Sequence, residues 1–196
     1  MGQYWMQSGG SATIDEGLSV CVDNNNNVYN TGYFTSTFEM SGQQLNSQGL
    51  DDIYICKLDS TGALDWLIRE GGSAQERALS IDADGSGNIV ISGYFYGTTS
   101  IGGTQLISNG QQDIFIAKYS SSGTFLWVRQ AGGINNEQGN DVHFDNAGNI
   151  VVTGEFSGTC NFSATTLTSQ LGSIDIFLAK YDSNGNLIFA KKGRSE

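Results

Sequence analysis

One pattern of residues occurs three times along the chain at an interval of 61 residues. Its markers are an aspartate, a glycine and a leucine in each repeat: Asp23, Asp84 and Asp145; Gly32, Gly93 and Gly154; Leu45, Leu106 and Leu167. A single additional residue within 169–175 displaces the last markers of the third repeat, Asp175, Lys180 and Gly185. Units repeated this regularly cannot bury their apolar side alone, so neighbouring repeats must stack on one another.

Each repeat contains the signals of four β-strands. In the first repeat we expect strands at 17–23, 28–34, 52–59 and 63–72. Leu18, Val20 and Val22 alternate with other residues, which is the period of a strand. Turns rich in Asn and Gly separate the strands, in a chain that has 27 Gly and no Pro.

Four antiparallel strands repeated at this interval predict an all-β fold, a partial β-propeller. We expect a single repeat domain over 1–196, with three four-stranded blades and one extra N-terminal outer strand. The first strand of each blade is expected to be innermost and the strand that carries Trp66 or Trp127 outermost. The expected boundaries are 1–10 for the outer strand of a preceding blade, 11–72 for blade 1, 73–133 for blade 2 and 134–196 for blade 3.

Several phrases of the repeat resemble a known bacterial repeat. The segments VDNNNNVYNTGYF (22–34), DIFIAKYSSSGTFLWVRQAGG (113–133) and HFDNAGNIVVTGEF (143–156) are similar to the seven-bladed β-propeller repeat of secreted or surface proteins from Bacteroidetes-like bacteria. The resemblance implies a non-catalytic extracellular or cell-surface module with more than three blades. We therefore expect either the remaining blades of a longer parent chain or a homodimer that closes a six-bladed ring.

The composition excludes several classes of partner. The 20 acidic and 9 basic residues give a formal net charge of −11, which repels the phosphates of nucleic acids. No apolar run approaches the ~18 residues of a membrane helix, so membrane insertion is not expected. The N-terminal residues lack the basic and apolar regions of a signal peptide.

Cys21, Cys56 and Cys160 are expected to be free thiols, because the first and third strands of a blade lie too far apart for a disulfide.

The connections between strands carry the candidate ligand-binding residues. Each fourth-to-first connection holds one acid at an equivalent position, Asp15, Glu76 or Glu137. These carboxylates could form an acidic ring that attracts cationic ligands. We favour the alternative, in which each accepts hydrogen bonds from backbone donors where the first strand begins.

The segments of ~16 residues between the second and third strands are too long for plain turns. Equivalent apolar residues within them predict a packed extension of the second strand: Met40, Ile101 and Phe162, followed by Leu45, Leu106 and Leu167. Their variable polar positions include Gln43, Gln44, Gln105 and Gln111. By analogy with other propellers, we place these glutamines on one ligand-binding face with the acids.

Two patterns are candidates for metal binding. Asp82 and Asp84 have the spacing of carboxylates in calcium loops. Because Asp84 recurs in each repeat as an ordinary turn residue, we expect no metal or other cofactor, with calcium as the alternative. Asp82 is equivalent to Cys21 and His143, and we expect these three residues to lie too far apart to share one ion.

No catalytic set is recognisable. His143 is the only histidine, and no nucleophile is placed beside it by any motif. One lysine recurs on each third strand and is expected to form ion pairs between strands: Lys57, Lys118 and Lys180. We therefore expect a non-enzymatic module for adhesion or for the recognition of a glycan or protein ligand. The alternatives are a polysaccharide hydrolase or lyase that uses carboxylates and needs further blades, and a purely structural spacer.

Overall fold

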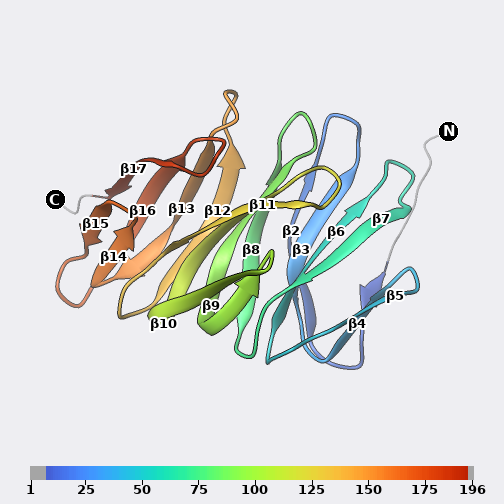
Figure 1. Cartoon of the computed structure of the whole chain (residues 1–196), viewed down its shortest axis with the longest axis horizontal. Coiled ribbons are helices and arrows are strands. Elements are labelled where there is room, and N and C mark those ends of the chain that lie inside the picture. The colour runs from blue at the N-terminus through green and yellow to red at the C-terminus, as the bar shows by residue number, and fades with distance from the viewer. Residues whose placement is uncertain (1–7, 194–196) are drawn as a thin grey trace.

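The computed structural model describes residues 8–193, and every regular element in this part of the chain is a β-strand (Figure 1). Three antiparallel sheets of four strands form the expected blades. Blade 1 contains β2 (Asp15–Val22), β3 (Val28–Phe34), β6 (Asp52–Leu58) and β7 (Leu64–Glu70). Blade 2 contains β8 (Glu76–Ala83), β9 (Ile89–Ile101), β10 (Thr104–Tyr119) and β11 (Phe125–Ala131). Blade 3 contains β12 (Glu137–Phe144), β13 (Ile150–Ser157), β16 (Ile174–Tyr181) and β17 (Leu187–Lys192). The predicted all-β, partial β-propeller fold is confirmed.

Two smaller sheets complete the described part of the chain. One contains β1 (Gly9–Gly10), β4 (Thr37–Met40) and β5 (Gln43–Asn46), and the other contains β14 (Thr159–Phe162) and β15 (Thr165–Thr168). Gly9 and Gly10 pair with Met40 and Glu39 of β4. The rest of the N-terminal outer strand expected over 1–10 lies outside the described residues, so that assignment stays a prediction.

Within each blade the strands follow chain order, so the first and fourth strands form opposite edges of the sheet. The first strand has a bulge at the same place in every blade, where its pairing with the second strand shifts register. The recurring glycine of the second strand lies opposite this bulge. A Cβ atom at Gly93 would lie only 1.9 Å from the backbone oxygen of Arg77, which explains why no larger residue occupies the position.

Most of the hydrophobic core lies between blades, and a further cluster that includes Tyr54 and Cys56 belongs to blade 1 alone. One layer joins side chains of blade 1 to blade 2, including Tyr29, Ile53, Ile55, Ile81, Ile91 and Phe115. A second layer joins blade 2 to blade 3, including Ile114, Ile116, Val142, Val152, Phe162 and Phe177. Because each layer takes residues from two repeats, each blade depends on its neighbour for burial.

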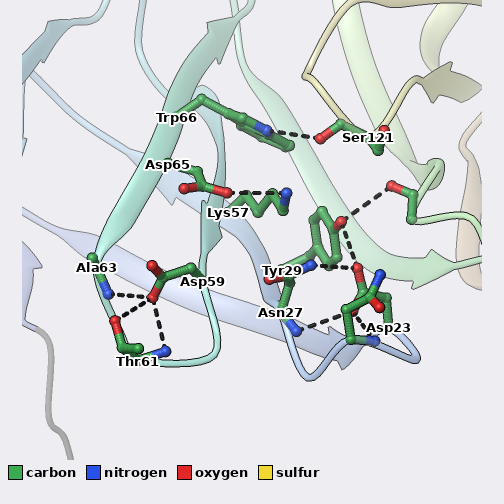
Figure 2. Close-up of polar contacts among 12 residues, drawn as sticks. Asp23, Asn27, Tyr29, Lys57, Asp59, Thr61, Ala63, Asp65, Trp66 and Ser121 are labelled. Atoms are coloured by element: carbon green, nitrogen blue, oxygen red, sulfur yellow. Dashed lines mark hydrogen bonds and ion pairs between the residues drawn. The ribbon is translucent and has the colours of Figure 1, made fainter.

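Polar contacts also cross the junctions between blades (Figure 2). The indole nitrogen of Trp66 donates a hydrogen bond to the backbone oxygen of Ser121, 3.2 Å away. The hydroxyl of Tyr29 lies 3.2 Å from the backbone oxygen of Gly87 in blade 2, to which it donates. It also donates to the Asp23 carboxylate over 3.1 Å, so the junction is tied to the first turn of blade 1.

The recurring lysines form the expected ion pair between strands in blade 1, where Lys57 on β6 lies 3.0 Å from Asp65 on β7 (Figure 2). In blade 2 the residue equivalent to Asp65 is Leu126, and Lys118 instead donates to the backbone oxygen of Ser183, 3.2 Å away. In blade 3, Lys180 pairs with Asp145 over 2.7 Å, at the turn that follows β12. The lysine is thus kept while its partner varies with the local sequence.

The three cysteines are free thiols. Cys21 lies on β2 and Cys56 on β6, with β3 between them, as the sequence predicted. Cys56 is buried, like the equivalent Ala117 and Ala179. Burial raises the pKa of the Cys56 thiol to about 11, so this cysteine serves as a small packing residue at neutral pH.

Candidate functional site

Two kinds of connection meet at one end of the blades, drawn at the lower side of Figure 1. These are the fourth-to-first connections and the segments between the second and third strands, and together we call them the loop face. Their backbones are joined by hydrogen bonds, from the nitrogen of Leu50 to the oxygen of Ala74 (2.8 Å) and from the nitrogen of Tyr96 to the oxygen of Gln75 (3.0 Å). The prediction that both kinds of connection share one face is confirmed.

The segments between second and third strands are β-hairpins in all three blades. They are β4–β5 in blade 1, the far ends of β9 and β10 in blade 2, and β14–β15 in blade 3. Met40, Ile101 and Phe162 are buried and anchor the hairpins against the core, as the repeated apolar residues predicted. Only in blade 2 is the hairpin continuous with the second strand, which extends from Ile89 to Ile101. The buried apolar side chains therefore pack each hairpin against the core, while the variable polar residues of the hairpins face outward.

The recurring acids of the fourth-to-first connections accept hydrogen bonds from backbone nitrogens, as we favoured. Each acid accepts from the residue four positions earlier: Asp15 from Ser11 (2.6 Å), Glu76 from Gly72 (2.9 Å) and Glu137 from Gly133 (2.7 Å). The Glu76 and Glu137 side chains are fully buried. These two carboxyls hold the entry of the first strand and do not present their oxygens to solvent.

A second carboxyl lies beside each buried glutamate. The negative charge of Asp113 on β10 acts on Glu137, and that of Asp52 on β6 acts on Glu76. Burial, with this repulsion added, raises the pKa of both glutamates to about 7, against the pull of the glycine N–H groups. Gln130 donates to Asp113 over 2.7 Å, whereas Arg69 donates to Asp52 over 2.6 Å. The sequence did not lead us to expect Asp52 and Asp113 as neighbours of the buried glutamates, although these two aspartates are separated by the repeat interval.

The glutamines of the expected ligand-binding face are exposed, in contrast to the buried Glu76 and Glu137. Gln43 and Gln44 are exposed on β5, Gln105 is exposed on β10, and Gln111 is exposed just before the buried part of β10. The loop face thus has buried carboxyls beneath and exposed amides above. The ligand-binding role of these residues stays a prediction.

Five exposed aliphatic side chains on the loop face were missed by sequence reasoning. They are Ile14, Leu50, Ile107, Ile134 and Leu171, all of which are at least 61% exposed. None recurs: the equivalent residues in the other repeats are polar or alanine, and Leu171 is the one inserted residue of the third repeat. Apolar residues that break the repeat at exposed positions are the signal that could have identified them, because the buried apolar residues recur.

The insertion at Leu171 accompanies a pocket of about 570 Å³ in blade 3. Its lining is formed mainly by the β14–β15 hairpin and the loop that follows, and it includes Asn135, Ser157, Thr168, Leu171 and Ile174. Hydroxyl and amide groups therefore lie next to two exposed aliphatic side chains. This combination can accept an apolar side chain with polar neighbours.

The candidate metal ligands are mostly engaged in local contacts. Asp84 accepts hydrogen bonds within its own turn, from the nitrogens of Ser86 (2.9 Å) and Asn88 (3.0 Å). Asp82 accepts from the nitrogen of Phe144 and lies 3.4 Å from Nδ1 of His143, so these equivalent residues on neighbouring first strands are closer than expected. Over residues 8–193 no three His, Cys, Asp or Glu side chains gather into a metal-binding group. The calcium alternative stays a prediction.

Three stacked four-stranded blades built from one repeat define this molecule as a partial β-propeller. No protein-family model matches the chain. The chain is similar to the uncharacterized WD repeat-containing protein L264 of Acanthamoeba polyphaga mimivirus, with 24% identity over 226 residues that include 94% of this chain. It spans 16% of the length of that protein. Within residues 8–193 there is no helix of the length and apolar character needed to cross a membrane.

Proposed function

We propose that this chain is a non-catalytic recognition module that binds a protein partner through its loop face. The observation that carries the proposal is the set of five exposed aliphatic side chains, which we call the loop-face aliphatic set: Ile14, Leu50, Ile107, Ile134 and Leu171. Exposed apolar side chains on connections held by a rigid scaffold are characteristic of protein interaction sites.

The asymmetry of this set supports recognition over a purely structural role. Many residues that build the blades recur at equivalent positions, whereas each member of the loop-face aliphatic set occurs in one repeat only. A spacer needs only the recurring residues. Binding of a specific partner, in contrast, needs a surface whose side chains differ from one repeat to the next.

The chemistry of the loop-face acids favours binding over catalysis. Glu76 and Glu137 are fully buried and bound to backbone nitrogens, so they do not face a position that a polysaccharide could occupy. The similarity to a WD repeat-containing protein also supports a β-propeller scaffold for interaction. With a formal net charge of −11, the partner surface is expected to be neutral or basic.

A glycan is the second candidate ligand. The pocket at Leu171 is lined by several hydroxyl and amide groups, including those of Asn135 and Ser157, which suit sugar hydroxyls. Adhesion at a bacterial surface, in a secreted or surface-attached parent, is the setting implied by the repeat phrases. That setting is supported by the resemblance of the phrases alone.

The test compares proteins retained by the immobilised chain with those retained by a loop-face variant. The variant combines Leu50→Gln, Ile107→Thr and Ile134→Ser, each taken from the equivalent position of another repeat, so that the fold should accept it. Leu126→Asp is the matched control, because Leu126 is exposed on the outer strand β11 and Asp65 occupies its equivalent position in blade 1.

We expect at least one protein to be retained by the natural chain and by the control, and lost from the loop-face variant. Its direct binding would then be measured with purified partners, with a loss of at least ~tenfold in affinity expected for the variant. If the three chains retain the same proteins, the proposal is wrong. If a glycan array gives the only binding, and the loop-face variant loses it, the glycan candidate replaces the protein partner.

A further inference from the structure

The junction between blades 1 and 2 contains a buried glutamate that the junction between blades 2 and 3 lacks. Glu70, at the end of β7, accepts two hydrogen bonds from blade 2. The Tyr119 hydroxyl donates to its Oε1 over 3.0 Å, and the backbone nitrogen of Gly102 donates to its Oε2 over 2.8 Å. At the second junction the equivalent residue is Ala131, which has no side-chain acceptor. The two junctions therefore differ by one buried carboxylate.

The tyrosine that binds this glutamate is nevertheless kept at the second junction. It is Tyr181 on β16, which is only 3% exposed. Burial raises the pKa of its phenol well above the usual range, so the hydroxyl keeps its proton and remains a donor. Within residues 8–193 this hydroxyl has no hydrogen-bond acceptor. A hydroxyl buried in this way is stabilised when a ligand supplies the acceptor.

Tyr181 lines a pocket of about 310 Å³ between blades 2 and 3. The lining also includes Arg129 on β11 and Ser163 in the turn of the β14–β15 hairpin. Ser163 is equivalent to Gly102, the residue whose backbone nitrogen donates to the glutamate at the first junction. A carboxylate in this pocket would thus have the same two kinds of donor, a tyrosine hydroxyl and a backbone N–H group.

An aromatic ring that packs in this region at the first junction is replaced by a smaller side chain at the second. Phe125 packs edge to face on Tyr119, with ring centres 5.7 Å apart. Its ring also lies against Gly102, where a Cβ atom would be 2.0 Å from it. The equivalent of Phe125 in blade 3 is Leu187, which lines the pocket. The pocket therefore has room for an apolar group beside its polar donors.

Arg129 provides a positive charge at the pocket. Its guanidinium donates to three backbone oxygens over 2.7–2.9 Å, which leaves two of its five N–H groups for a ligand. Unlike Arg69 and Arg77, it forms no ion pair with a carboxylate among residues 8–193. Its charge acts on the Tyr181 hydroxyl, as the charge of Arg69 acts on Glu70. The local charge thus favours an anion, although the chain as a whole is acidic.

We propose that this pocket binds a small carboxylic acid whose apolar part is a phenyl ring or a group of similar size. The ligand carboxylate takes the place of Glu70 and accepts hydrogen bonds from the Tyr181 hydroxyl and the Ser163 backbone nitrogen. Its apolar part takes the place of the Phe125 ring. No member of the loop-face aliphatic set lines this pocket, so the inference is independent of the proposed function.

A ligand-observed NMR titration of the full chain with sodium hydrocinnamate tests the proposal. An acid of this size should bind with a Kd of about 0.1–1 mM. Hydrocinnamyl alcohol has the same ring and no carboxylate, so it should bind at least ~tenfold more weakly. A tripeptide that ends in phenylalanine carries the same two groups. Tighter binding of the tripeptide than of the free acid would identify a peptide C-terminus as the source of the carboxylate.

Three variants test whether the acid binds in this pocket. Ala131→Glu supplies the carboxylate found at the first junction, so it should engage both donors and weaken hydrocinnamate binding at least ~tenfold. Leu126→Asp adds the same charge on the exposed side of β11 and is the matched control, for which binding should not change. Tyr181→Phe keeps the ring and removes the donor, so binding should weaken by about threefold to tenfold. Circular dichroism checks that each variant is folded.

Three results would overturn the proposal. The absence of saturable hydrocinnamate binding up to about 10 mM would show that the pocket does not take such an acid. Equal binding of the acid and the alcohol would show that no carboxylate is recognised. Binding that persists unchanged in both Ala131→Glu and Tyr181→Phe would show that the acid binds elsewhere on the chain.

Discussion

The indole nitrogen of Trp66 donates a hydrogen bond to the backbone oxygen of Ser121 across the junction between blades 1 and 2 (Figure 2). The same bond joins Trp127 to Ser183 across the next junction, over 3.1 Å. A backbone acceptor does not depend on which side chain the turn carries, so the joint can be repeated wherever the tryptophan is kept. The recurring tryptophan thus joins each blade to the next through a hydrogen bond.

Replacement of this tryptophan should loosen the junction. Trp66→Phe removes the N–H donor and part of a ring that packs against the core, so we expect the free energy of unfolding to fall by about 1–2 kcal/mol. Urea denaturation checks this value. Leu126→Asp, on the exposed side of the outer strand, should change the same quantity by less than about 0.5 kcal/mol. Equal effects of the two changes would show that the indole bond contributes nothing.

The buried glutamates should make stability depend on pH. The pKa of Glu137 is raised by burial, and further by the Asp113 charge, to about 7, compared with 4.5 for an ordinary glutamate. The folded protein therefore holds this proton after the unfolded chain has released it, and the stabilisation is lost as the pH rises from about 4.5 through 7. Glu137→Gln keeps an acceptor oxygen for Gly133 and cannot ionise. Above pH 7 it should be more stable than the natural chain, by on the order of 1 kcal/mol.

Urea denaturation at pH 4 and pH 8 tests this expectation. The difference between Glu137→Gln and the natural chain should appear at pH 8 and vanish at pH 4. Glu39→Gln removes the same charge from an exposed position on β4 and is the control. If the free energies of unfolding of Glu137→Gln and the natural chain differ by the same amount at pH 4 and pH 8, the buried-proton explanation is wrong.

Equivalent residues in different blades should differ in their contribution to stability. Ile114→Ala creates a cavity between blades 2 and 3, and should lower the free energy of unfolding by about 2–5 kcal/mol. Ile176→Ala changes the equivalent residue on the exposed face of blade 3, and should cost less than about 1 kcal/mol. Thermal or urea unfolding checks both values. Similar losses would mean that this face of blade 3 is covered.

The glycine opposite the bulge should not accept a side chain. At Gly93 a Cβ atom would meet the backbone oxygen of Arg77 at 1.9 Å, so Gly93→Ala should cost about 3 kcal/mol or more. Gly148 has a φ of 77° and open space around it, so Gly148→Ala should cost only about 1 kcal/mol of backbone strain. Circular dichroism and urea denaturation distinguish the two. Tolerance of Gly93→Ala would mean that β8 can move away from β9.

The repeat predicted the strands closely because local chemistry specifies them. The second strand of blade 1 was expected at 28–34 and β3 has these bounds, since alternating residues and flanking turns mark both ends. The site could be predicted only in part. The role of Glu76 and Glu137 followed from their place at the start of a strand, but their partners Asp52 and Asp113 lie more than twenty residues away in the chain.

The sequence by itself determined the number of repeats, the four strands in each and the order in which they pair. These features depend on the alternation of apolar residues and on the residues of the turns, which are local properties that recur in each repeat. The tertiary structure alone decided which equivalent residues are buried. Ile114 and Ile176 are the same residue in the same strand position, yet one is fully buried and the other is 65% exposed, because only Ile114 has a blade packed against it. Burial at a junction is a property of two neighbouring repeats, so it cannot be read from one.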